Sequence, residues 1–318
     1  MVPNKINTLD LFSGCGGSSW GAKRAGVKLS AALDSWQLAC QNYKENFKKV
    51  QLFNDRIENV DPRIIEDSVG KIELIIASPE CTSHTCARGS NPRSEGSRMT
   101  AFEVTRFAKV LKPRWIVIEN VVHMRTWSRY SEMIGILNED LGYRVCEQVI
   151  DSSTLGVPQS RRRLFITCDL KKEPSRVQTD CCEKVPASSI IQAGQYSFSP
   201  LLTEKRAKAT LERANRAISN VGKQTPFLIV YYGSDAAGGW QPVNRPLRTI
   251  TTLDRFAYVV PDKTGYKMRM LQVPEIKAAM GFPPQFKLPH GTRRDKIHLL
   301  GNAVCPPVME KVIRSLVW

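Results

Sequence analysis

The sequence predicts an α/β fold with a parallel central sheet and a second, smaller domain. In the first half, short apolar runs alternate with amphipathic segments, which is typical of buried parallel strands and the helices that cover them. After Cys168 the chain becomes polar, uneven and basic, and from Phe227 to Val260 it is β-rich and interrupted by glycines. A chain of 318 residues is long enough for one large core and a smaller unit.

The elements of the first half follow from these patterns in order. Most of the predicted strands are short apolar runs, and the predicted helices are longer or amphipathic segments between them. The expected strands are 7–12, 29–33, 72–77, 115–118, 143–151 and 164–168, and the expected helices are 20–25, 36–47, 102–111 and 131–141.

These patterns divide the chain into three parts. Residues 1–170 form the sheet domain, 171–295 a small domain and hinge with a basic helical stretch at 204–217, and 296–318 a C-terminal segment that packs back on the sheet domain. A basic, irregular module beside a catalytic domain is typical of a substrate reader, although an unspecialised insertion has the same appearance.

Composition narrows the class of protein. The formal charge of +16 favours a polyanionic partner, because binding to phosphates releases counterions; the alternative is a basic protein without such a partner. No apolar run approaches the ~20 residues that span a bilayer, and no signal region follows the N-terminus. The nine cysteines form no CxxC pair and the four histidines are scattered. We expect a soluble, unsecreted protein in a reducing compartment without a metal site.

A glycine turn, Asp10 to Gly17, follows the first strand. Glycines allow a tight turn and bring backbone amides close to a ligand, although any tight turn from strand to helix looks similar. Asp34 ends the second strand, where an acid commonly holds ribose hydroxyls, and Asp55 follows the third apolar patch. Two acids at strand ends suit an adenosine group.

Cys81 and Glu119 both follow buried strands. Cys81 is followed by the polar loop 82–99, and such a loop is suited to closing over a substrate. This position makes Cys81 a candidate nucleophile, provided that its surroundings activate the thiol. Burial beside an apolar strand is expected to raise the pKa of Glu119, so that it acts as a general acid. The alternatives are an inert cysteine and a capping or salt-bridged glutamate.

Arg161 and Arg163 alternate at the entrance of the last strand, so both side chains are expected on one face. Arginine guanidinium groups suit ring carbonyl oxygens and phosphates. The alternative interpretation is a solvated basic run.

Together these motifs resemble the DNA (cytosine-5) methyltransferase family. The resemblance covers residues 1–170 and 245–318 and depends on motif order. The motifs are DLFSGCGG at 10–17, acids at 34 and 55, a cysteine motif at 79–81, ENV at 119–121, QSRRR at 159–163 and GNAV with paired prolines at 301–307.

The resemblance implies a Rossmann-like S-adenosylmethionine-dependent methyltransferase sheet with a smaller target-recognition domain. It implies that Cys81 adds to cytosine C6, that Glu119 engages N3 and the exocyclic amine, and that Arg161 and Arg163 support the catalytic loop and cytosine O2. The implied S-adenosylmethionine-binding residues are Phe12, Gly14, Gly16, Gly17, Asp34, Trp36, Asp55, Asn302 and Val304.

The chain departs from the family pattern beside two of these residues. The usual Pro-Pro-Cys-Gln is Pro79-Glu80-Cys81-Thr82, and the carboxylate of Glu80 opposes formation of a neighbouring thiolate. The position after Asp34 is Ser35 rather than an apolar residue, so Trp36 is expected to supply the ring that stacks on adenine.

The resemblance therefore predicts methylation of cytosine C5 in duplex DNA, on a flipped base, in restriction-modification or orphan DNA modification. We expect a cytoplasmic, nucleoid-associated monomer in a bacterial or phage-infected cell. If the protein acts in restriction-modification, we also expect a companion restriction endonuclease. Two alternatives are a tRNA cytosine-5 methyltransferase of the same family and a catalytically disabled DNA-binding member.

Overall fold

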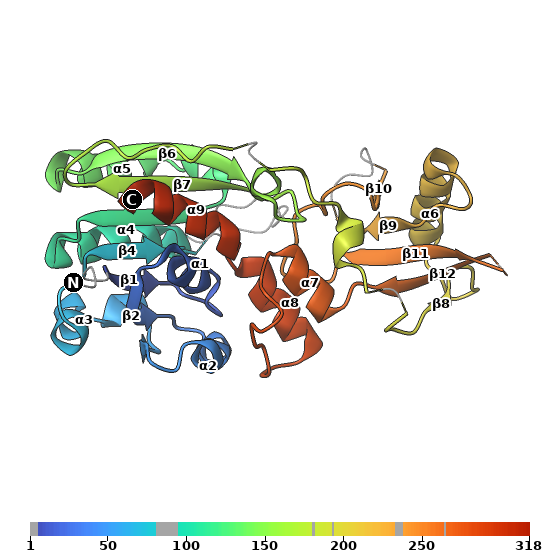
Figure 1. Ribbon diagram of the computed structural model, residues 1–318, viewed down its shortest axis with the longest axis horizontal. Helices are drawn as coiled ribbons and strands as arrows, with labels where there is room; N and C mark the ends of the chain where they lie inside the picture. Colours follow the sequence, from blue (N-terminus) through green and yellow to red (C-terminus); the bar gives the residue numbers. More distant parts are fainter. Residues whose placement is uncertain (1–5, 81–94, 180–181, 193, 233–237, 264) are drawn as a thin grey trace.

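The computed structural model describes residues 6–80, 95–179, 182–192, 194–232, 238–263 and 265–318, without the side chains of residues 95 and 97. Its main feature is a seven-stranded sheet with the order β3-β2-β1-β4-β5-β7-β6 (Figure 1). The strands are β1 (Asn7–Leu11), β2 (Lys28–Leu33), β3 (Gln51–Phe53), β4 (Leu74–Ala77), β5 (Trp115–Asn120), β6 (Arg144–Asp151) and β7 (Arg162–Asp169).

The predicted α/β class is confirmed, but the sheet is mixed rather than parallel. Strands β3, β2, β1, β4 and β5 are parallel, whereas β7 is antiparallel to both β5 and β6. The reason is the short connection from β6 to β7 through residues 152–161, because a parallel crossover needs a dozen or more residues. All residues of β4 and β5 are buried, as expected for strands covered on both faces.

Helices cover both faces of this sheet. One core contains apolar residues of α1, α2 and α9, and a second core contains those of α3, α4 and α5. The helices are α1 (Gly17–Ala25), α2 (Gln37–Asn46), α3 (Pro62–Val69), α4 (Glu95–Leu111), α5 (Tyr130–Gly135) with a following π-helix (Ile136–Asp140), and α9 (Pro306–Val317).

Strand β3 was expected only as an apolar patch before Asp55, without bounds, and helix α3 was not predicted. Strand β3 has only three residues, which is too short for a periodic signal. Helix α3 did carry a signal, because Asp61 caps it by accepting a hydrogen bond from the Arg63 amide and Pro62 occupies its first turn, a combination typical of helix starts.

A second, five-stranded antiparallel sheet lies at the opposite end of the molecule, with α7 and α8 between the two sheets (Figure 1). Helix α6 packs on β9 and β10. The domain boundaries at 170 and 295 remain predictions. The elements are β8 (Ser199–Pro200), α6 (Lys208–Val221), β9 (Phe227–Val230), β10 (Trp240–Pro242), β11 (Phe256–Asp262), β12 (Gly265–Met270), α7 (Val273–Ala279) and α8 (Arg293–Asn302).

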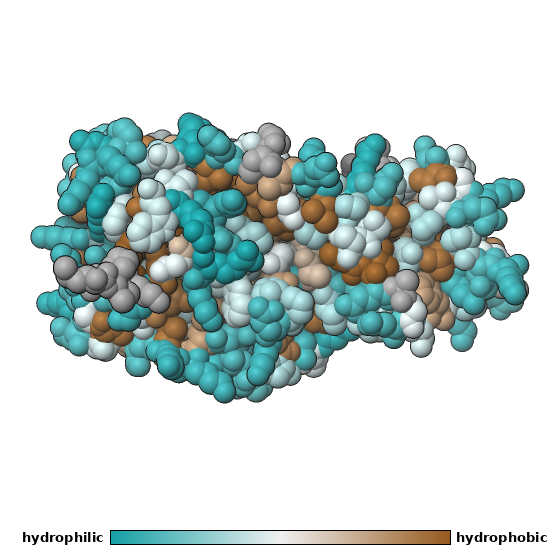
Figure 2. All heavy atoms as spheres, in the orientation of Figure 1, coloured by the Kyte–Doolittle hydropathy of each residue, from teal (hydrophilic) through white to brown (hydrophobic). Residues whose placement is uncertain are grey.

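The surface is largely hydrophilic on the face shown in Figure 2, and hydrophilic side chains dominate its rim. Within the described part of the chain, no helix combines the length and apolar character that crossing a bilayer requires.

The two ends of the chain meet where α9 packs against α1. A Cβ atom added to Gly21 would lie 2.5 Å from the carbonyl oxygen of Pro306 and 2.7 Å from Cβ of Met309. Because these atoms belong to the backbone and to a Cβ position, no side-chain rotation relieves the contact.

We therefore predict that Gly21→Ala destabilises the protein by about 1–2 kcal/mol, because overpacking at a backbone contact outweighs the ~1 kcal/mol gain in helix propensity. Urea unfolding measures the effect. The matched control is Gly135→Ala in α5, where an added Cβ meets no atom within 4 Å. The control is expected to be neutral or slightly stabilising, and a Gly21→Ala variant as stable as the control would contradict the prediction.

Candidate functional site

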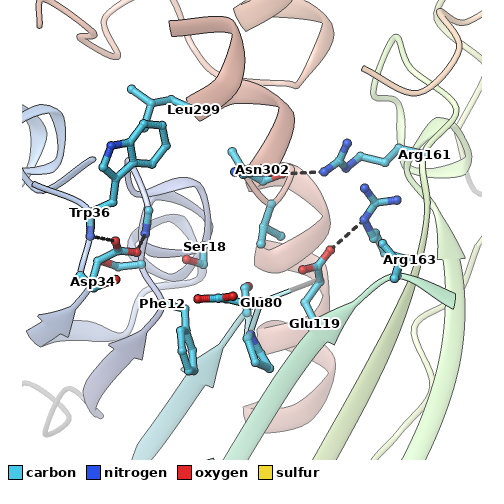
Figure 3. A pocket seen from close by; sticks show the side chains of 18 residues that line it. Phe12, Ser18, Asp34, Trp36, Glu80, Glu119, Arg161, Arg163, Leu299 and Asn302 are labelled. Carbon is cyan, nitrogen blue, oxygen red and sulfur yellow. Dashed lines mark hydrogen bonds and ion pairs between the residues drawn. The ribbon is translucent and has the colours of Figure 1, made fainter. Parts of the chain in front are cut away.

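A cavity of about 250 Å³ opens at the carboxyl ends of β1, β2, β4 and β5, where ligands bind in open α/β sheets. Segments from both ends of the chain line it (Figure 3). The described lining residues are Phe12, Ser13, Gly14, Ser18, Asp34, Ser35, Trp36, Ser78, Pro79, Glu80, Glu119, Val121, Arg161, Arg163, Leu299, Asn302, Ala303 and Val304.

The cavity brings together most of the predicted site residues. Nine of them line it, namely Phe12, Gly14, Asp34, Trp36, Glu119, Arg161, Arg163, Asn302 and Val304. Gly16, Gly17 and Asp55 are not among the described residues that line it. Cys81 lies outside the described residues, and the described chain reaches the cavity wall at Glu80, next to it.

The glycine turn serves packing as well as the cavity. Gly14 has φ +53° and Gly16 has φ +101°, a left-handed region that favours glycine. A Cβ atom on Gly16 would collide with the ring of Phe47, and one on Gly17 would collide with the carbonyl oxygen of Val304. Gly16 and Gly17 therefore allow close approach of neighbouring segments.

Asp34 is held rigidly at the end of β2. Its Oδ2 accepts a hydrogen bond from the Gly14 amide at 2.7 Å and its Oδ1 accepts one from the Trp36 amide at 2.8 Å. Burial raises the pKa of Asp34, while these two hydrogen bonds lower it. Each carboxylate oxygen accepts more than one hydrogen bond, so Asp34 retains acceptor capacity toward the cavity.

Trp36 forms part of the cavity wall, and its ring contacts the ring of His298 with centroids 4.9 Å apart. Phe12, on the other side of Asp34 in Figure 3, also lines the cavity and has φ +58°. The two rings give this half of the cavity apolar surface beside a buried carboxylate.

Glu119 and Arg163 form a shielded ion pair on the other half of the cavity. Nε of Arg163 lies 3.2 Å from Oε1 of Glu119, and Figure 3 shows the two side chains directed toward each other. Burial raises the pKa of Glu119, and the two nearby arginines, Arg163 and Arg161, lower it. The predicted direction of this shift is thus confirmed.

Arg161 has a different environment from Arg163. Its guanidinium group donates to the carbonyl oxygens of Ile250 at 2.9 Å, Gly301 at 2.8 Å and Ala303 at 3.2 Å. Arg161 therefore fastens two distant backbone segments at the cavity wall, whereas Arg163 contacts the carboxylate.

The side chain of Asp55 is exposed and faces its own turn. Its Oδ1 accepts hydrogen bonds from the Arg56 amide at 2.7 Å and from Nδ2 of Asn59 at 2.8 Å. In this structure Asp55 organises the chain after β3.

Several lining residues were not predicted. Ser13, Pro79 and Ala303 lie within the glycine turn, the cysteine motif and GNAV, and Ser18, Ser78 and Leu299 lie next to or near these motifs. Their positions within or near the motifs could have identified them as lining residues. Their apolar and hydroxyl side chains, however, carry no chemistry that distinguishes them from other residues of the same types.

Asp10 was also missed as a functional neighbour, although it lies behind the cavity wall. Its Oδ2 accepts hydrogen bonds from the hydroxyls of Ser18 and Ser19, both at 2.6 Å. Oδ1 has no hydrogen-bond partner in the described part of the chain. Burial raises the pKa of Asp10 to about 7, and the serine hydrogen bonds lower it only partly.

This shift predicts a pH dependence of stability. Because the pKa of Asp10 is raised in the folded state from 3.8 to about 7, its contribution is fully present below pH 3.8 and is lost as the pH rises through 7. Ionisation of Asp10 is expected to reduce the unfolding free energy by on the order of 4 kcal/mol.

Asp10→Asn is expected to remove this component of the pH dependence of stability between about pH 4 and pH 7. A constant change in stability caused by the amide does not affect the slope. Urea unfolding at several pH values measures the slope. Asp67→Asn, at an exposed acid, is the control and should leave the slope of the parent protein. Identical slopes for the parent and Asp10→Asn would contradict the shift.

The chain is similar in sequence to a known family of enzymes. A sequence model described as C-5 cytosine-specific DNA methylase matches residues 6–318. The chain is 28% identical over 308 residues to the Type II methyltransferase M.HgiDI of Herpetosiphon aurantiacus, covering 94% of this chain and 90% of the relative. It is also 28% identical to the Type II methyltransferase M.HindV of Haemophilus influenzae, covering 98% and 96%.

Solved structures share the fold at lower identity. A Spodoptera frugiperda DNMT2 mutant superposes with a TM-score of 0.74 at 20% identity, covering 99% of this chain and 100% of that chain. A putative DNA modification methyltransferase encoded within an E. coli prophage superposes with a TM-score of 0.69 at 19% identity, covering 98% of both chains.

Proposed function

This chain belongs to the C-5 cytosine-specific DNA methylase family, and on that premise we propose that it methylates C5 of a flipped cytosine in duplex DNA through a covalent adduct of Cys81. One observation carries the proposal. A single cavity presents Asp34 and two aromatic rings on one side, the Glu119–Arg163 pair on the other, and Glu80, the neighbour of Cys81, between them.

The residues of the cavity fit S-adenosylmethionine. Phe12 and Trp36 offer ring surfaces for adenine, and Asp34 offers carboxylate oxygens for ribose hydroxyls. Gly14, Asn302 and Val304 complete this half of the wall. When bound, the cofactor supplies an electrophilic methyl group on a positively charged sulfur. Asp55 would approach adenine only with a side-chain orientation other than the one it has here.

The role proposed for Cys81 follows from the chemistry of cytosine. C5 of cytosine is too weakly nucleophilic to accept a methyl group unaided. A thiolate of Cys81 adds to C6, and the electron density that this bond pushes into the ring makes C5 nucleophilic. After C5 has taken the methyl group, loss of its proton and elimination of the thiolate restore the ring and the free cysteine.

Glu119 relieves the charge that develops on the ring. Its raised pKa makes the carboxyl easier to protonate than usual, so that it can donate a hydrogen bond or a proton to N3. Arg163 lies 3.2 Å from the same carboxyl and orients it, and its remaining donors are suited to a ring carbonyl such as O2. Arg161 acts as a positioning residue through the backbone of 250 and 301–303.

DNA is the substrate supported best. The net charge of +16 favours a polyanion, and the Type II methyltransferases M.HgiDI and M.HindV cover nearly the whole chain. We infer that the protein acts in restriction-modification, with a companion endonuclease, or as an orphan modification enzyme. The region 171–244, which includes β8, β9 and β10 of the second sheet, is the proposed target-recognition region.

A transfer assay that offers both duplex DNA and tRNA tests the proposal. Labelled methyl groups from S-adenosylmethionine are expected in DNA as 5-methylcytosine, at sites that bisulfite sequencing identifies. Methylation confined to tRNA would reassign the substrate, and prolonged incubation without transfer to either would indicate a disabled member of the family.

Cys81→Ser is expected to abolish methyl transfer and the covalent adduct with DNA containing 5-fluorocytosine, because the hydroxyl is a much weaker nucleophile at neutral pH. Denaturing gel electrophoresis detects the adduct. Cys146→Ser, at a half-buried cysteine outside the cavity, is the control and should form the adduct. Methylation by Cys81→Ser at the parental rate would remove Cys81 from the mechanism.

Glu119→Gln is expected to lower kcat by about 100-fold or more, because an amide cannot transfer a proton to N3. The Kd for S-adenosylmethionine should change less than twofold, since Glu119 lies on the side of the cavity away from Asp34. Single-turnover kinetics and calorimetric titration separate the two effects. A variant with parental kcat would contradict the role of Glu119.

A further inference from the structure

Glu80 is a cavity residue that the mechanism above does not use. Five charged side chains line the cavity, and four are engaged. Asp34 accepts two backbone amides, Glu119 pairs with Arg163, and Arg161 donates to backbone carbonyls. Glu80 is exposed and has no hydrogen bond or ion pair with any described residue.

The residue before Glu80 is anchored to a neighbouring strand. The carbonyl oxygen of the preceding Pro79 accepts a hydrogen bond from Nδ2 of the buried Asn120 at 3.1 Å. This bond ties the residue before Glu80 to the end of β5, beside the cavity wall.

The carboxylate of Glu80 points toward the half of the cavity that contains Asp34. Figure 3 shows Glu80 between Phe12 and Glu119, with its carboxylate directed toward the Phe12 and Asp34 side. The negative charge of Glu80 is one of the influences that raise the pKa of Asp34, after burial. The carboxylate of Glu80 is therefore directed at the half of the cavity that fits the cofactor, where the carboxylate of Asp34 also lies.

The cofactor and its product differ in charge at one atom. In the transfer, a bond forms between C5 of the ring and the methyl carbon, the bond from sulfur to that carbon breaks, and its electron pair stays on sulfur. The positively charged sulfonium becomes a neutral thioether, S-adenosylhomocysteine. A carboxylate in the same cavity attracts the sulfonium and has no such attraction for the thioether.

We infer that Glu80 is a specificity-determining residue that makes the cavity prefer S-adenosylmethionine over S-adenosylhomocysteine and so limits inhibition by the product. The inference rests on the proposed function and adds the discrimination between cofactor and product. The same charge opposes formation of the Cys81 thiolate, so Glu80 favours turnover at low cofactor-to-product ratios at the expense of nucleophile activation.

The expected size of the effect is modest. Glu80 is exposed, so solvent and salt screen its charge. We expect Glu80→Gln to weaken S-adenosylmethionine binding by about three- to tenfold at low ionic strength. This is the size expected for attraction between a carboxylate and a sulfonium at a high effective dielectric constant. Binding of S-adenosylhomocysteine should change less than twofold.

Calorimetric titration of the full chain with each of the two ligands tests the inference. The Kd for S-adenosylhomocysteine divided by the Kd for S-adenosylmethionine measures the preference. This ratio is expected to fall toward unity in Glu80→Gln and to be retained in Glu80→Asp, which keeps the charge. Glu139→Gln makes the same chemical change at an exposed glutamate outside the cavity and should change neither Kd. Raising the salt concentration should reduce the preference of the parent protein and leave Glu80→Gln unaffected.

The outcomes separate the inference from the proposed function. If the parent protein binds both ligands and Glu80→Gln changes both Kd values equally, or neither, the inference is overturned and the proposed function stands. If the parent protein binds neither ligand, the proposed function fails and the inference fails with it. A Kd ratio that falls in Glu80→Gln and persists in Glu80→Asp supports the inference.

Discussion

The cavity depends on close backbone contact between the two ends of the chain. The segment from Gly301 to Pro306 passes so near α1 that glycine is required at positions 17 and 21, and Gly301 itself packs on the backbone of Thr251. Arg161 adds hydrogen bonds to the carbonyls of Gly301 and Ala303. Because α9 then packs along α1, the last part of the chain becomes one wall of a site whose other walls come from the N-terminal strands.

Burial and charge are balanced differently on the two sides of the cavity. On one side, Asp34 is held by two backbone amides beside aromatic rings. On the other, Glu119 is buried against Arg163, and burial outweighs the arginine in setting the direction of its pKa. A carboxyl that is protonated more readily than usual is suited to donate to a ring nitrogen, whereas a carboxylate with spare lone pairs is suited to accept from hydroxyls. Burial raises the pKa of both carboxyl groups, and they differ in their partners, which are backbone amides for Asp34 and Arg163 for Glu119.

A buried ion pair links the second sheet to the helices that lead back to the cavity. Arg269 on β12 forms two hydrogen bonds with Glu275 on α7, at 2.7 and 2.8 Å, and the rings of Tyr196, Phe198 and Tyr258 lie 5.1–5.6 Å from its guanidinium carbon. Glu275 also accepts the amides of Gln192 and Gln272. Breaking such a pair typically costs several kcal/mol because one charge remains buried without its partner. The contact therefore fixes the end of β12 relative to α7 and α8.

The sequence by itself determined the alternation of strands and helices, the family, and the residue types that the cavity brings together. Periodicity and turn glycines are written in neighbouring residues, and motif order is read along the chain without knowing which segments pack together. Only the tertiary structure decided that β7 runs antiparallel, that Gly16 and Gly17 serve packing, that the side chain of Asp55 faces its own turn, and that Arg161 and Arg163 divide into a backbone clamp and a partner of Glu119. Each of these depends on which distant segment packs against the residue, and a sequence pattern does not encode that contact.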